Sequence, residues 1–147
     1  MKTKSLINSC YAISGITAMI GVWELMNIAT LSYEMGKDSS DSFIWYFLTR
    51  GIHAWGIIGS CVVFFILANQ ATKSAIFTKA NESLLMISGY IMIVLGCISY
   101  LLIKLLPIDS FSSPASILMI LEGLSFIFFS LIFSISRKLK EEQDLTI

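Results

Sequence analysis

The chain has 147 residues, of which 56% are hydrophobic and only 14% are charged. A soluble domain carries roughly 25% charged residues, so this chain lacks the charge that a water-facing surface needs. Lys and Arg total 10, as do Asp and Glu, and the resulting net charge of zero argues against direct binding of nucleic acid. Composition therefore predicts a small integral membrane protein.

Four stretches are long and apolar enough to cross a bilayer as helices, which takes roughly 20 residues. In chain order they cover about 5–28, 43–68, 83–106 and 114–136. They are too long for membrane strands, and only a helix satisfies its own backbone in lipid. We expect an all-α protein, in which residues 1–147 form one antiparallel four-helix membrane domain that ends in a tail at 137–147.

Basic residues are sorted to one side of this topology. The connections at 34–42 and 107–114 carry one lysine, Lys37, against four acidic residues. The side that holds both termini carries seven basic residues, and the positive-inside rule therefore places both termini in the cytoplasm. These seven are Lys2, Lys4, Lys73, Lys79, Arg137, Lys138 and Lys140.

Motifs for metal, cofactor or covalent chemistry are missing from the sequence. Cys10, Cys61 and Cys97 lie in separate predicted spans, and one histidine gives no metal-site spacing. We find no glycine-rich phosphate loop, no G-x-S-x-G and no H-E-x-x-H pattern. We expect no catalytic residue, metal or cofactor, and we interpret the cysteines as packing residues. A membrane enzyme ranks third among the functions, because no nucleophile–base pair is visible.

Ionisable side chains within the predicted spans are the first candidate site. Their predicted positions all fall in the outer half of the membrane. A charged side chain at the bilayer centre costs roughly 2.5–3.5 kcal/mol, so such residues normally face the bundle interior and pair. One interpretation is an outward-opening polar pocket that binds a lipid headgroup, a small solute or a peptide. The other is that the acids and bases pair as packing features, Glu24 with Arg50 and Glu122 with Lys104. The candidates are Glu24, Arg50, His53, Lys104 and Glu122.

Small residues recur at helical spacing beside these charges. The first span places Ser14, Thr17, Gly21 and Glu24 on one face. The third span places on one face Gly89, Ile93, Gly96, Tyr100 and Lys104. Such seams allow membrane helices to approach closely. We therefore expect these faces to lie inside the bundle.

The connection before the third span and the tail form the second candidate site. Thr78 is a plausible N-cap of the third helix, with Phe77 before it as a hydrophobic staple. The tail starts with basic residues, which suit anionic lipid headgroups, and continues with acidic ones.

The loop Ile76-Phe77-Thr78 with Asn81, and the tail LKEEQDLTI at 139–147, resemble a family of small bacterial four-span membrane proteins of unknown function (DUF2975-type). The match departs from the family pattern at Ala75 and Ile76. The resemblance implies the same fold in the bacterial inner membrane, and no established activity. Members are often encoded beside a helix-turn-helix regulator, which implies a cytoplasmic protein partner for this chain.

We therefore expect a non-enzymatic accessory or regulatory protein whose partners include the lipid bilayer, such a regulator and further copies of the chain. The alternative is a solute- or lipid-binding protein, or an oligomeric transporter, that uses the outer polar pocket. For the tail, the competing interpretation is that it folds back and caps the bundle. The candidate partner-binding residues are Phe77, Thr78, Asn81, Glu142, Asp144 and Leu145.

Overall fold

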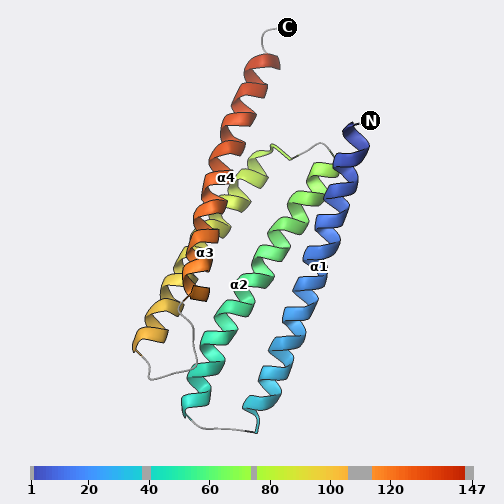
Figure 1. Ribbon diagram of the computed structural model, residues 1–147. Coiled ribbons are helices and arrows are strands. Elements are labelled where there is room, and N and C mark those ends of the chain that lie inside the picture. Colours follow the sequence, from blue (N-terminus) through green and yellow to red (C-terminus); the bar gives the residue numbers. More distant parts are fainter. Residues whose placement is uncertain (1, 38–40, 74–75, 106–113, 145–147) are drawn as a thin grey trace.

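A computed structural model describes residues 2–37, 41–73, 76–105 and 114–144 of the chain. They form four helices, α1 (Lys2–Met35), α2 (Asp41–Thr72), α3 (Lys79–Leu105) and α4 (Pro114–Asp144), and no strand occurs among them. Successive helices run antiparallel, so the two termini lie at the same end of the molecule (Figure 1). Each helix is long and apolar enough to cross a membrane, and the all-α four-helix prediction is confirmed.

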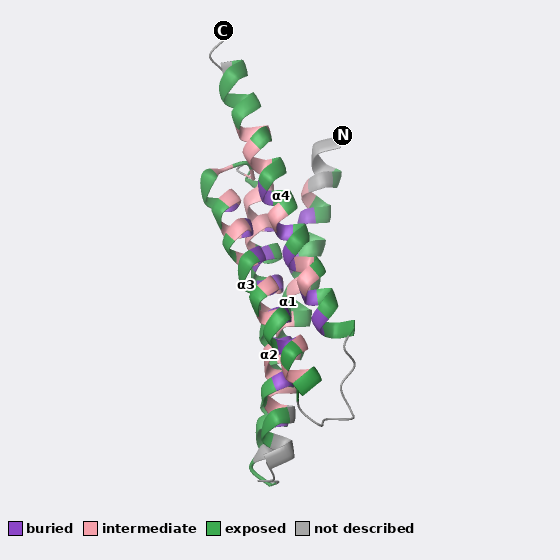
Figure 2. Cartoon of the chain, turned by 90° about the vertical axis from the view of Figure 1, so that its left-hand side faces the viewer, coloured by how far each residue is buried: buried purple, intermediate pink, exposed green. Residues whose placement is uncertain are grey.

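The four helices form two antiparallel pairs, α1–α2 and α3–α4, which α2 joins. α1 contacts α2 alone, whereas α2 also contacts α3 and, less extensively, α4. Figure 1 accordingly places α1 at one edge of the molecule, and most of its described side chains are exposed. In Figure 2, exposed residues also predominate in the part of α4 nearest the C-terminus. Only 6% of the apolar window of α1 is buried, against 44% for α2. The bundle is therefore open along α1.

The core that positions the polar groups lies between α2, α3 and α4. Val63, Leu85 and Phe126, one from each of these helices, form a buried apolar cluster. Phe64 packs edge-on against Phe126, with ring centroids 5.5 Å apart. Apolar contact thus holds α2 against the α3–α4 pair, at a level where Leu85 lies in the second turn of α3.

The closest backbone approach is between α3 and α4, where glycines meet. A Cβ atom added at Gly89 would lie 2.7 Å from the Gly123 carbonyl oxygen, and one added at Gly123 would lie 2.6 Å from the Gly89 carbonyl oxygen. A Cβ added at Gly96 would lie 3.0 Å from the carbonyl oxygen of Ser116. The glycines of the predicted inward face of the third helix therefore contact α4. Lys104, predicted on the same face, is instead exposed.

The predicted polar seam of the first helix faces α2. Ser14 is buried, and Thr17 and Glu24 are half-buried. A Cβ added at Gly21 would lie 3.6 Å from the Cys61 Cβ atom, which is ordinary van der Waals contact. The α1–α2 pair is therefore packed less closely than the α3–α4 pair.

Helix α4 continues beyond the predicted apolar stretch, which ends near 136, to Asp144. In Figure 1 this extension projects past the other three helices at the end that holds the termini. Arg137 supports the extension because its Nη1 atom donates a hydrogen bond to Glu141, one turn further along, at 2.9 Å. The tail therefore does not fold back over its described residues.

Candidate functional site

A buried polar cluster connects α2, α3 and α4 through His53, Ser99 and Ser116. The His53 Nε2 atom lies 2.8 Å from the Ser99 hydroxyl and 3.2 Å from the Ser116 hydroxyl. Ser116 donates to Ser99 at 3.0 Å, which leaves the Ser99 proton for the Nε2 atom of a neutral His53. Every helix except α1 thus contributes one member.

The cluster brings a serine hydroxyl and an imidazole within the distance of a nucleophile and its base. Both serines are 0% exposed and His53 is 6% exposed, so a substrate would have to separate packed helices to reach them. The cluster instead gives each of the three polar side chains hydrogen-bond partners, and it links three helices to one another.

Sequence reasoning selected His53 and missed both serines. A usable signal was present, because Ser99 continues the spacing of Gly89, Met92 and Gly96 along one face of α3, and these residues are all buried. A hydroxyl on a small-residue face of a membrane helix is a natural partner for a buried imidazole on a neighbouring helix.

Arg50 lies in a different place, beside a cavity of about 190 Å³ between α1 and α2. The polar residues around this cavity are Asn27, Thr30 and Glu34 from α1 and Arg50 from α2. Buried Leu31 and Ala54 also line it. The cavity lies toward the end of the molecule opposite the termini, since Glu34 is in the last turn of α1.

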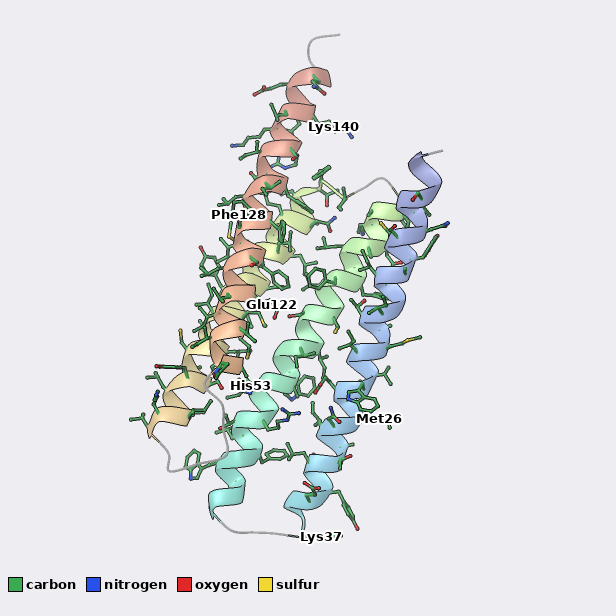
Figure 3. The ribbon with its side chains drawn as sticks, viewed as in Figure 1. Met26, Lys37, His53, Glu122, Phe128 and Lys140 are labelled. Atoms are coloured by element: carbon green, nitrogen blue, oxygen red, sulfur yellow. The ribbon has the colours of Figure 1, made fainter. Side chains whose placement is uncertain are left out.

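Glu24 and Glu122 approach α2 from opposite sides, from α1 and from α4. Both carboxylates are half-buried. Figure 3 shows Glu122 closer than His53 to the end that holds the termini, so the two residues belong to different levels of the bundle.

The sequence-based pairing of Glu24 with Arg50 and of Glu122 with Lys104 is not formed. The ion pairs among the described side chains are those of Arg137 with Glu82 and with Glu141. Lys104 is exposed, with its Nζ atom 5.8 Å from the centroid of the Tyr100 ring. The five intramembrane candidates thus do not form one site. His53 lies in the buried cluster, Arg50 lines the cavity, Glu24 and Glu122 are half-buried, and Lys104 is exposed.

At the end that holds the termini, the loop residues support the start of α3. The Asn81 backbone N–H donates to the Thr78 hydroxyl at 3.3 Å, which confirms Thr78 as the N-cap. Asn81 is only 3% exposed, and its side-chain amide donates to the Ile76 carbonyl at 2.8 Å. Thr78 and Asn81 thus have structural roles in the chain itself.

Phe77 packs against Phe133 of α4 with ring centroids 5.1 Å apart. A staple would contact its own helix, so this contact across to α4 differs from the prediction. Phe77 nevertheless remains 44% exposed. It is therefore both a packing residue and a surface residue.

Glu82 joins α3 to the base of the α4 extension. Its carboxylate accepts hydrogen bonds from Nε and Nη2 of Arg137 at 3.3 and 3.1 Å. Its carbonyl oxygen accepts one from the Ser130 hydroxyl at 2.9 Å. Sequence reasoning treated Arg137 as a topological charge and did not foresee this ion pair.

The remaining partner-binding candidates lie at the end of α4. Glu142 is exposed on the extension, whereas the Asp144 side chain and all of Leu145 lie outside the described residues. Within the part of the chain that the structure describes, no group of three or more His, Cys, Asp or Glu residues is arranged to hold a metal ion.

Comparisons with family models, curated proteins and solved structures find no match to this chain. The resemblance of the loop and tail to the four-span bacterial family therefore stays a prediction. What the structure adds is a multi-pass helical architecture with two distinct regions of polar chemistry: the buried cluster around His53 and the cavity beside Arg50.

Proposed function

We propose that this protein is a non-enzymatic accessory or regulatory protein of the bacterial inner membrane, with both termini in the cytoplasm. In this proposal the α4 extension presents a helical surface to a soluble partner. The supporting observation is that α4 continues as a helix to Asp144 and projects beyond the other helices, instead of folding back onto them.

The distribution of charge supports the orientation. Basic residues gather at the end of the molecule that holds both termini, where Lys73, Lys79 and Lys138 are exposed. Basic residues flanking membrane spans are retained on the cytoplasmic side. The extension would therefore point into the cytoplasm.

The surface of the extension suits a protein partner. Leu139 is 55% exposed, beyond the apolar stretch of α4, and exposed Lys138, Lys140 and Glu142 surround it. An apolar side chain among charges on a rigid helix is a common element of helix recognition. Phe77, at the same end, adds an exposed aromatic edge.

The resemblance names the partner to test, a helix-turn-helix regulator encoded beside the gene. Binding of that purified regulator to the full-length protein in detergent would be measured for wild type and for Leu139→Glu. We expect this substitution to weaken binding about tenfold, the effect of losing one well-packed anchor. Lys73→Glu, at an exposed site at the same end, serves as the control and should bind normally.

Removal of residues 141–147 tests the competing interpretation. If the tail caps the bundle, the deletion lowers the thermal unfolding midpoint of the whole protein. If it serves a partner, the midpoint is retained and regulator binding is weakened, because the deletion removes Glu142 from the proposed surface. Equal binding by wild type, Leu139→Glu and the deletion variant would contradict the proposed function.

A further inference from the structure

The cavity beside Arg50 lies at the end of the molecule opposite the proposed cytoplasmic surface, and it is lined by polar and charged side chains. Its polar walls comprise a carboxylate, a guanidinium, an amide and a hydroxyl, from Glu34, Arg50, Asn27 and Thr30. At about 190 Å³ it is smaller than the roughly 300–1,000 Å³ of sites for drug-sized molecules. It fits a group of a few heavy atoms.

The two charges of the cavity do not neutralise each other. Glu34 and Arg50 are both exposed and line the same space, and the ion pairs among the described residues are formed only by Arg137. Thr30 donates its hydroxyl proton to the Met26 carbonyl, so its oxygen can still accept a hydrogen bond. A ligand that carries one negative and one positive group can therefore satisfy both side chains.

The position of the cavity indicates the source of such a ligand. It lies near the end of α1 and opposite the termini, where exposed Tyr33 and Trp45 are typical of the membrane–water interface. Ile28 and Leu31, which line the cavity, also line a second cavity of about 250 Å³ with Phe47, Leu48 and Trp55. Apolar surface thus lies beside the charged groups, as a lipid requires.

We propose that the cavity binds the headgroup of a phospholipid with a primary amine, whose phosphate contacts Arg50 and whose ammonium contacts Glu34. A guanidinium suits a phosphate because it offers several donors in a planar fork. A primary ammonium donates hydrogen bonds to a carboxylate, whereas the trimethylammonium of a choline headgroup has no N–H to donate. An anionic headgroup without an amine, such as phosphoglycerol, would satisfy Arg50 and leave Glu34 without a cation.

This inference rests on the membrane placement proposed above and is independent of the cytoplasmic partner. Native mass spectrometry of the full-length protein in detergent would compare phosphatidylethanolamine, phosphatidylcholine and phosphatidylglycerol with identical acyl chains. We expect wild type to retain phosphatidylethanolamine about tenfold better than the other two, the effect of one charged hydrogen bond. Soluble O-phosphoethanolamine should compete weakly, because it lacks acyl chains.

Variants of Glu34 and Arg50 test which residue contacts the ammonium and which contacts the phosphate. Glu34→Gln should abolish the preference for phosphatidylethanolamine over phosphatidylglycerol, and Arg50→Gln should reduce retention of all three lipids. Arg50→Lys keeps the charge and should recover part of this loss. Lys104→Gln removes an exposed charge of the α3–α4 pair and is the matched control, so its lipid retention should equal that of wild type.

Three results would overturn the proposal. The first is equal retention of the three lipids by wild type, and the second is a preference that persists in Glu34→Gln. The third is competition by O-phosphoethanolamine as strong as that of the lipid, which would identify a free solute as the ligand. None of these results depends on whether Leu139 binds a regulator, so the two proposals fail separately.

Discussion

The α3–α4 pair and the α1–α2 pair have the same antiparallel arrangement but differ in how closely their backbones approach. Between α3 and α4, Gly89 and Gly123 face each other so closely that neither has room for a methyl group. Beside α1 and α2, cavities of about 190 and 290 Å³ that open to the surface are lined by residues of both helices. The backbones of one pair thus meet closely, whereas the other pair leaves open space beside its helices.

The sequence difference behind this contrast is the placement of glycine. The glycines of α3 and α4 lie at the contact between the helices, whereas a Cβ at Gly15 or Gly59 would meet no atom within 4 Å. A glycine at a contact shortens the distance between helix axes, and a glycine that faces open space does not. The position of glycine, more than its number, therefore distinguishes the two pairs.

The largest effect is expected from breaking the close pair. Gly123→Ala places a methyl group against the Gly89 carbonyl, 2.6 Å away, so the backbones of α3 and α4 must separate. We expect the free energy of unfolding to fall by about 1–3 kcal/mol, the usual cost of overpacking. Unfolding in mixed detergent micelles, followed by circular dichroism, measures this loss.

Gly15→Ala is the matched control for this measurement, because it makes the same chemical change where no atom lies within 4 Å. It should leave stability unchanged or raise it slightly through better helix propensity. Equal losses in both variants would show that the two pairs do not differ in closeness.

A smaller loss is expected from Ser99→Ala, which removes the central hydroxyl of the buried cluster. Hydrogen bonds between membrane helices contribute about 0.6 kcal/mol on average and about 1.7 kcal/mol at most. A double-mutant cycle with Ser116→Ala should give a coupling energy in this range. Ser125→Ala removes an exposed hydroxyl that bonds its own helix and should show no coupling to Ser116.

Arg137→Gln is expected to act locally. The variant loses the ion pairs of Arg137 with Glu82 and Glu141, which hold the base of the α4 extension. Amide hydrogen exchange over 138–144 should accelerate several-fold while cooperative unfolding of the bundle hardly changes, because partly exposed ion pairs contribute little to global stability. Lys138→Gln serves as control, and equal acceleration in it would remove the role assigned to Arg137.

The smallest effect is expected from Gly21→Ala in the open pair. The added methyl would lie 3.6 Å from the Cys61 Cβ atom, a distance that requires no movement of α1. Its unfolding free energy should match that of wild type, in contrast to Gly123→Ala. A loss as large as that of Gly123→Ala would mean that α1 and α2 also depend on close backbone contact.

Much of the fold follows from the sequence because the bilayer restricts the choices. A charge-poor stretch of the length of 83–106 is stable in lipid only as a helix, because a helix satisfies its own backbone hydrogen bonds. The short connections then require consecutive helices to lie antiparallel. The extension of α4 escaped this reasoning because its residues are charged. At the base of this extension, Arg137 forms an ion pair with Glu82 on another helix, which local sequence does not reveal.

The candidate sites were less predictable because they depend on which helix faces meet. His53 and Arg50 are one turn apart in α2, yet the structure places one in a buried cluster and the other beside a cavity. The distinction arises because α1 contacts α2 alone, which leaves Arg50 opposite α1 and His53 opposite α3 and α4. Local spacing contains no information on that arrangement.

The same arrangement has a consequence for biogenesis. The most extensive contacts join helices that are consecutive in the chain, so each hairpin closes at little entropic cost once its second helix has been synthesised. The imidazole of His53 gains its hydroxyl partners only after α3 and α4 have entered the membrane. We therefore expect assembly to end with the docking of a late hairpin onto an early one, and the histidine–serine contact to report its completion.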